Sequence, residues 1–184
     1  MFEELIAQHC GPALAGIKPG NLVTCYKKKM PDVKTEIDRL NRELNPKDIF
    51  IEPVCECSER ILLFVYRKKQ LHAYLCKQEI QSLLQSCSYP ASQNTEMYLQ
   101  HLKSRLKQND FPHEIGAFLG YPIHDIYGFI YHKHSGCLLV GEWRVYADAE
   151  AAARLFRQYK TCRRAIVKRL RQGKTLAQIF CAAS

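Results

Sequence analysis

The sequence predicts an α+β fold over residues 1–184 as a single domain, with a small, mainly antiparallel sheet of about four strands, several helices and a long C-terminal helix. Three observations predict it. Short apolar runs bounded by turn residues indicate strands at 22–26, 49–54 and 61–66. The polar link between the last two is short enough for an antiparallel hairpin. Apolar residues recur at helical spacing in most of the remaining chain.

Helix and strand boundaries follow from glycine, proline and capping residues. We expect a first helix that ends at about His9, because Gly11 and Pro12 follow it. Asp148 should cap the long final helix, and Gly173 should end it. The other predicted elements are helices at 32–44, 71–87 (one or two helices), 95–107, 112–119 and 122–130, and a strand at 137–146.

The composition favours a cytoplasmic protein with no membrane partner. The chain has 47% hydrophobic and 24% charged residues, which is the globular range. Its start, Met-Phe-Glu-Glu, is acidic where a signal peptide would be basic, and no apolar run is long enough to cross a bilayer. The nine cysteines are odd in number and scattered, a pattern typical of reduced thiols in a reducing compartment.

Positive charge is concentrated at the C-terminal end. The formal net charge is +9, and residues 150–184 hold nine Lys and Arg residues against one Glu. On a helical wheel the basic residues lie nearly opposite an apolar stripe. They are Arg154, Arg157, Lys160, Arg164, Lys168 and Arg171. A solvated helix face explains this pattern, and an anion-binding face is the alternative.

Residues 114–130 have the apolar spacing of a helix-turn-helix, which makes a DNA-binding regulator an alternative function. Base recognition requires Arg, Lys, Asn or Gln near the start of the second helix. This helix instead begins Pro122, Ile123, His124, Asp125. Nucleic acid is therefore a disfavoured partner, and two short helices packed in a core fit the same pattern.

Histidines, one glutamate and one cysteine are the candidates for chemistry. His113 and Glu114 occupy a predicted first helical turn, where a neutral imidazole could act as a base or ligand and a glutamate could instead cap the helix. His113, His132 and His134 are the candidate metal ligands, although a solvated turn explains His132 and His134 better, because no third ligand is close to them in sequence.

Cys10 is the candidate reactive cysteine. It lies at the predicted break after the first helix, and Lys18 follows in a Gly/Pro-rich loop. A nearby cation would lower the pKa of the thiol. The alternative is a structural thiol.

Large aromatic residues gather among glycines between Phe111 and Tyr146. Tyr121 and Trp143 are the candidate ligand contacts there, together with Lys18 from the earlier loop. Aromatic side chains among glycines can line a ligand pocket, and they also fill ordinary cores.

Two blocks of sequence resemble a known family. They are HCGPALAGIKPGNLVTC at 9–25 and FPHEIGAFLGYPIHDIYGFI at 111–130, and the second contains Pro-His-Glu-Ile-Gly followed by Phe-Leu-Gly-Tyr-Pro. They resemble an uncharacterised family of bacterial proteins, chiefly of anaerobes, classed as a domain of unknown function. The resemblance implies one full-length domain, and it assigns no reaction or cofactor.

The leading hypothesis is a cytoplasmic protein that binds a small ligand or a metal-containing cofactor between the loop at 9–25 and the segment Phe111–Tyr146. Cys10, Lys18, His113 and Glu114 would supply polar contacts, and an enzyme with Cys10 as nucleophile or His113 as base is one version. A protein-interaction module that uses the aromatic residues as a docking surface is a further alternative. The pattern names no substrate, cofactor or oligomeric state.

Overall fold

The computed structural model describes residues 2–92, 94–108 and 111–180. The chain divides into two compact units. Unit 1 comprises Met1–Leu71 and Cys162–Ser184, and unit 2 comprises His72–Thr161. The single domain expected over 1–184 stays a prediction, because one domain can contain two compact units.

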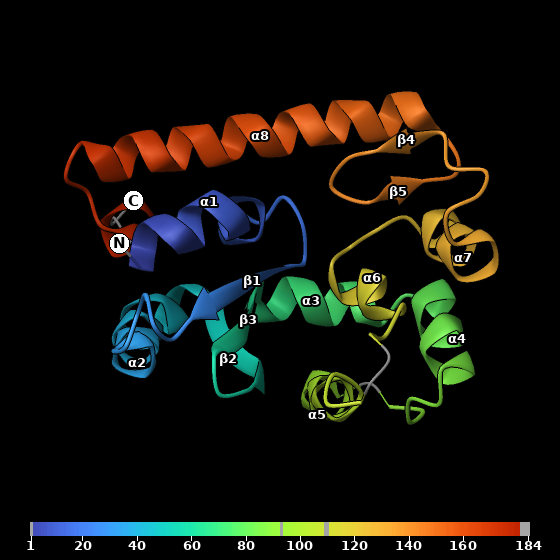
Figure 1. Cartoon of the computed structure of the whole chain (residues 1–184), viewed down its shortest axis with the longest axis horizontal. Coiled ribbons are helices and arrows are strands. Elements are labelled where there is room, and N and C mark those ends of the chain that lie inside the picture. The colour runs from blue at the N-terminus through green and yellow to red at the C-terminus, as the bar shows by residue number, and fades with distance from the viewer. Residues whose placement is uncertain (1, 93, 109–110, 181–184) are drawn as a thin grey trace. The chain divides into compact units, whose positions relative to one another are not determined.

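The α+β class, the antiparallel pairing and the long C-terminal helix are confirmed (Figure 1). Unit 1 contains α1 (Phe2–Leu14), β1 (Gly20–Tyr26), α2 (Val33–Leu44), the 3₁₀ turn η1 (Asn45–Lys47), β2 (Ile49–Glu56), β3 (Arg60–Arg67) and α9 (Leu176–Phe180). Unit 2 contains α4 (Gln78–Ser86), α5 (Thr95–Arg105), α6 (Ile115–Phe118), α7 (Ile123–His132), β4 (Leu139–Val140) and β5 (Arg144–Val145). Two helices, α3 (Lys68–Leu75) and α8 (Ala149–Arg171), belong partly to each unit.

The sheet of unit 1 has the strand order β1-β3-β2, and both pairings are antiparallel. The predicted hairpin at 56–60 connects β2 to β3, and Leu63 lies opposite Val23 on one side and Pro53 on the other. Alternate residues along the strands face one core with α1 and α2. This core holds Ile6, Cys10, Leu14, Val23, Cys25, Ile37, Leu40, Ile51, Leu63 and Val65, with Ile166 of α8 and Leu176 of α9.

The first helix is longer than predicted. It continues through Gly11 and Pro12 to Leu14, and the whole stretch from Cys10 to Leu14 is buried. Pro12 removes one helical N–H, yet burial of this apolar end outweighs the local preference for a break. Gly11 lies against α8, where an added Cβ would be 3.3 Å from the Cα of Arg163. The glycine therefore serves helix packing here.

Two predicted elements of unit 2 are shorter in the structure than expected. The helix expected at 112–119 is confined to α6, because Pro112, His113 and Glu114 form the turns that precede it. The strand expected at 137–146 is a short hairpin, β4 and β5, with a tight turn between them. The second helix of this segment begins one residue after Pro122, as its proline predicts, and extends to His132.

The long helix α8 has the bounds predicted for the final helix, but the short helix α9 follows it. The start of α8 is capped by Asp148, whose carboxylate accepts a hydrogen bond from the backbone N–H of Ala151 at 3.0 Å. This long helix ends before Gly173, whose φ of +86° is readily adopted by glycine alone. Within the described ranges, no helix combines the length and apolarity that a membrane span needs.

Close packing of α7 requires a glycine at position 128. A Cβ added to Gly128 would lie 2.4 Å from Cγ and 2.6 Å from Cβ of Tyr146, closer than van der Waals contact allows. We therefore expect Gly128→Ala to destabilise the protein by about 2 kcal/mol, although alanine is the better helix former. Thermal unfolding checks this. Tyr131→Ala, at an exposed position of the same helix, is the control, and an unchanged melting temperature for Gly128→Ala would contradict the packing described.

Candidate functional site

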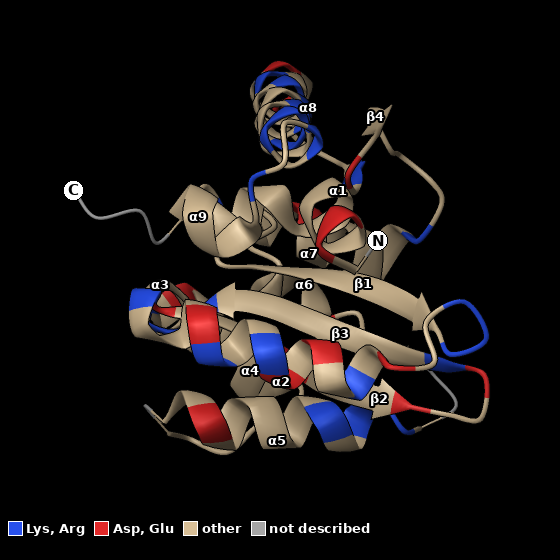
Figure 2. Ribbon diagram, turned by 90° about the vertical axis from the view of Figure 1, so that its left-hand side faces the viewer, with Lys and Arg blue, Asp and Glu red and all other residues tan. Residues whose placement is uncertain are grey.

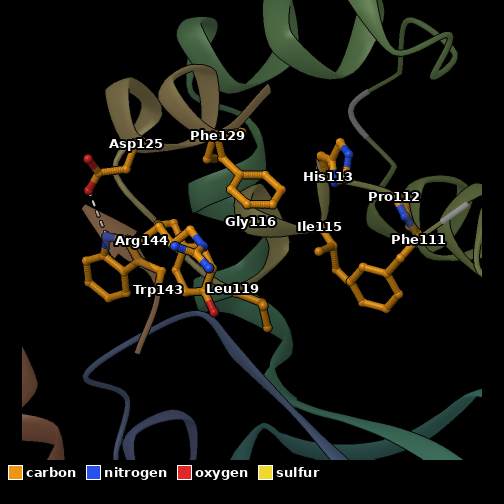
Figure 3. A pocket seen from close by; sticks show the side chains of 12 residues that line it. Phe111, Pro112, His113, Ile115, Gly116, Leu119, Asp125, Phe129, Trp143 and Arg144 are labelled. Atoms are coloured by element: carbon orange, nitrogen blue, oxygen red, sulfur yellow. Dashed lines mark hydrogen bonds between the residues drawn. The ribbon is translucent and has the colours of Figure 1, made fainter. Parts of the chain in front are cut away.

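A cavity of about 390 Å³ lies in unit 2, within the segment that the sequence singled out. Figure 3 shows its lining side chains. They are Phe111, Pro112, His113, Ile115, Gly116, Leu119, Tyr121, Asp125, Ile126, Phe129, Trp143 and Arg144. The walls thus come from the turns before α6, from α6 and α7, and from the β4–β5 hairpin.

The cavity is mainly apolar. Phe129 of α7 lies between the two groups of side chains in Figure 3, with His113 on one side of it and Arg144 on the other. Gly116 of α6 lets two side chains of the cavity wall approach closely, since an added Cβ would be 3.0 Å from Cγ1 of Ile126 and 3.1 Å from the ring of Tyr121. Any longer side chain at this position would enter the cavity or displace its walls.

Asp125 fixes the hairpin to the start of α7. Its buried carboxylate accepts hydrogen bonds from Nε1 of Trp143 at 2.7 Å, from the backbone N–H of Tyr146 at 2.7 Å and from that of Ala147 at 3.2 Å. Nε2 of His124 is 3.6 Å away. A buried carboxylate is costly unless its oxygens are satisfied, and here three donors satisfy them. This network determines where the indole lies.

Aromatic rings stack on that indole. The ring of Tyr121 lies 4.8 Å from the ring of Trp143 in a stacked geometry, and Phe156 of α8 meets the indole edge-on at 4.6 Å. The hydroxyl of Tyr121 donates to the carbonyl of Glu142 at 3.2 Å, and burial raises the pKa of Tyr121 to about 12. Gly141 allows this approach, because an added Cβ would be 2.2 Å from the Phe156 ring. Both predicted aromatic contacts therefore belong to the cavity wall.

Arg144 supplies a positive charge to this apolar wall. It directly follows Trp143, and it is half-buried. Across residues 2–92, 94–108 and 111–180, no carboxylate forms an ion pair with its guanidinium. An arginine beside an apolar cavity is well placed to bind an anionic group, because its planar fork matches a carboxylate.

His113 lies at the rim of the cavity. Its imidazole is exposed and meets the ring of Phe129 edge-on at 5.0 Å. It can contact a bound molecule from the side opposite Arg144 (Figure 3). A role as base stays a prediction.

Glu114 points into the protein and does not line the cavity. It is buried, and it accepts hydrogen bonds from Nε of Arg105 at 3.0 Å and from the hydroxyl of Tyr89 at 3.4 Å. It makes no capping hydrogen bond, so the alternative of a capping glutamate is wrong. Burial, with the Glu114 charge next, raises the pKa of Tyr89. This carboxylate links α5 to the turn before α6.

Cys10 and Lys18 lie in unit 1. The thiol of Cys10 is fully buried. Burial raises its pKa strongly, and the charge of Lys18 lowers it by a smaller amount. The expected effect of the lysine is thus present, but desolvation outweighs it. Lys18 is itself buried at 3% exposure. The thiolate that nucleophilic chemistry needs is disfavoured at this position.

The candidate metal ligands lie apart from the cavity, except for His113. His132 ends α7 at the surface, and His134 lies in the exposed turn that follows. Among the described residues, no three His, Cys, Asp or Glu side chains come close enough together to hold a metal ion.

In the helix-turn-helix alternative α6 would be the first helix, but α6 has only four residues. Asp125, Ile126 and Gly128 of α7, which would be the second helix, are buried.

The docking-surface alternative requires exposed apolar side chains. Trp143 is buried at 7% exposure, whereas Tyr131, Leu138 and Val140 expose large apolar side chains.

Sequence reasoning missed the roles of Asp125, Phe129 and Arg144. A lone acidic residue among the apolar residues Ile123 and Ile126 was the available signal for a buried acceptor. Nothing local identifies the other two, because their roles depend on the folded hairpin.

Removal of the Asp125 carboxylate should loosen the hairpin. We expect Asp125→Ala to destabilise the protein by about 3 kcal/mol, since three donors lose a charged acceptor. It should also shift the emission of Trp143, the single tryptophan of the chain, towards that of a solvated indole. Chemical denaturation followed by fluorescence measures both. Asp38→Ala, at an exposed site on α2, is the control, and an emission spectrum unchanged in Asp125→Ala would contradict this role.

Cysteine reactivity should follow exposure and not sequence position. Cys57 is exposed, and hydrogen bonds from the backbone at Glu59 and Arg60 lower its pKa. Burial instead raises the pKa of Cys10, and it raises the pKa of Cys25 to about 11. A lower pKa gives more thiolate at neutral pH. Alkylation of the native protein by iodoacetamide, followed by peptide mass spectrometry, should therefore modify Cys57 first.

The same reaction in guanidinium chloride is the control, because unfolding should equalise the three cysteines. Modification of native Cys10 as fast as Cys57 would show that the first helix opens readily.

Comparison with known proteins gives a family and no function. No curated protein and no solved structure matches the chain at a significant level. The family described as "Protein of unknown function (DUF3793)" matches residues 6–180. That range includes both units and all the residues that line the cavity. The chain therefore belongs to the DUF3793 family.

Proposed function

We propose that this protein binds a small organic anion with an apolar body in the cavity of unit 2. One observation carries the proposal. Arg144 lies beside a cavity of about 390 Å³ with apolar walls, and no carboxylate in the described part of the chain pairs with it. This volume is at the small end of the range for small-molecule sites. It suits a compound of one or two rings, or a short branched chain.

The apolar body of the ligand would contact Leu119, Ile126 and Phe129. Each methylene group that leaves water contributes about 0.8 kcal/mol to binding. The rings of Tyr121 and Trp143 are held by stacking and by the Asp125 hydrogen bond, so little conformational entropy is lost when a ligand orders them. A preformed apolar wall therefore favours binding of the body.

The anionic group of the ligand would pair with Arg144. A charged hydrogen bond contributes about 1.5–3 kcal/mol, and a carboxylate can accept two bonds from one guanidinium. His113 is the second polar contact, at the opposite rim. Cys10 and Lys18 are not required, because the residues that line the cavity all lie between Phe111 and Arg144.

Trp143 provides a direct readout, since it is the only tryptophan and lines the cavity. We expect phenylbutyrate to change its fluorescence in a saturable way. Arg144→Gln should weaken binding of phenylbutyrate about tenfold or more, because it removes the charged hydrogen bonds. The same variant should bind the neutral phenylbutyramide within about twofold of the wild type.

Arg154→Gln is the matched control. This arginine is exposed on α8 and does not line the cavity, so its variant should bind both compounds as the wild type does. An equal loss of affinity for phenylbutyrate and phenylbutyramide in Arg144→Gln would show that the charge of Arg144 does not select the ligand. Failure of both compounds to bind the wild type would contradict the proposal itself.

A further inference from the structure

A second hollow, in unit 1, is lined by basic residues. It has a volume of about 490 Å³ and lies where α1 packs against the end of α8. We call it the basic groove. Its lining residues are Gln8, Arg163, Arg164, Val167, Lys168, Arg171 and Gln172. The cavity of unit 2 shares none of them.

The positive charge of the basic groove is poorly neutralised by the described residues. Glu4 is 3.5 Å from Arg171, and it also accepts a hydrogen bond from Gln8. Across the described ranges, no carboxylate pairs with Arg164 or Lys168. Arg164 and Lys168 therefore carry positive charge that no carboxylate among the described residues pairs with, which favours an anionic partner.

The side chains are arranged along a line. Arg164, Lys168 and Arg171 are spaced by four and three residues, so they lie on one face of α8 over about 10 Å of helix axis. Figure 2, which views α8 nearly end-on, shows Lys and Arg segments on this helix. A linear series of cations matches a linear series of phosphates better than it matches a single compact anion.

The surroundings of the groove distinguish between kinds of polyanion. Among the described residues, none of the large hydrophobic side chains with high exposure lines the groove; they are Tyr26, Met97, Phe111, Tyr131, Leu138 and Val140. A membrane-surface helix needs exposed apolar side chains beside its basic ones. None of the described residues that line the groove is aromatic, so they offer no base stacking. Contact with a phosphodiester backbone requires neither.

We infer that the basic groove binds the phosphodiester backbone of nucleic acid without reading its bases. Arg164, Lys168 and Arg171 contact successive phosphates, and the amides of Gln8 and Gln172 offer further hydrogen bonds to phosphate oxygens. This site is independent of the helix-turn-helix-like segment at 114–130 and of the organic anion proposed for unit 2. Binding is therefore sensitive to salt and insensitive to base sequence.

The test is fluorescence anisotropy of labelled duplex DNA, duplex RNA and single-stranded DNA with the full chain. We expect binding to all duplexes tested, whatever their sequence, with a slope of log K against log salt of about −3 for three phosphate contacts. The triple variant Arg164→Gln, Lys168→Gln, Arg171→Gln should lose at least about tenfold in affinity and most of that slope. Glutamine is a good helix former, so α8 should persist, and circular dichroism checks this.

The matched control is Lys28→Gln, Lys29→Gln, Lys47→Gln, which removes the same charge from exposed lysines of unit 1. It should bind within about twofold of the wild type. Equal loss in both triple variants would overturn the inference, because net charge alone would then explain binding. So would the absence of binding at low salt. Groove-dependent binding to phosphatidylserine vesicles without binding to nucleic acid would overturn it in favour of a membrane surface.

Discussion

The carboxylate of Asp125 is the constraint on which the cavity depends. It lies in the first turn of α7 and accepts hydrogen bonds from the Trp143 indole and from the backbone after β5. A two-residue-per-strand hairpin has too few cross-strand pairs to be stable alone. The buried charge holds it in place. Because the indole is fixed, Tyr121 has a surface on which to stack, and Arg144 has a defined position beside it.

Glycines make the close approaches in this segment possible. Gly128 admits Tyr146, and Gly141 admits the ring of Phe156, which contacts the indole in turn. Gly116 likewise admits Ile126 and Tyr121, two residues of the cavity wall. Glycine therefore allows dense packing in and behind the cavity wall. Ordered walls around an open volume are the condition for selective binding of a small molecule.

The two proposed sites differ in size and in apolar surface, so each favours a different kind of anion. The cavity of unit 2 is small and apolar, with Arg144 as its cation, so a large hydrated polyanion would lose its solvation there without compensation. The basic groove of unit 1 offers several cations and less apolar surface than the cavity, so a hydrophobic acid would gain less from it. Neither site depends on a cysteine thiolate, and the buried Cys10 has the environment of a core residue.

The sequence by itself determined the α+β class, the antiparallel hairpin and the bounds of the long helix α8 with its Asp148 cap, because hydrophobic period and capping chemistry are local properties of the backbone. It also directed attention to the aromatic segment that lines the cavity. Only the tertiary structure decided that α1 continues through Pro12, that burial overcomes the effect of Lys18 on Cys10, and that Asp125 organises the hairpin. Those outcomes depend on desolvation and on partners far apart in the chain, which no local pattern encodes.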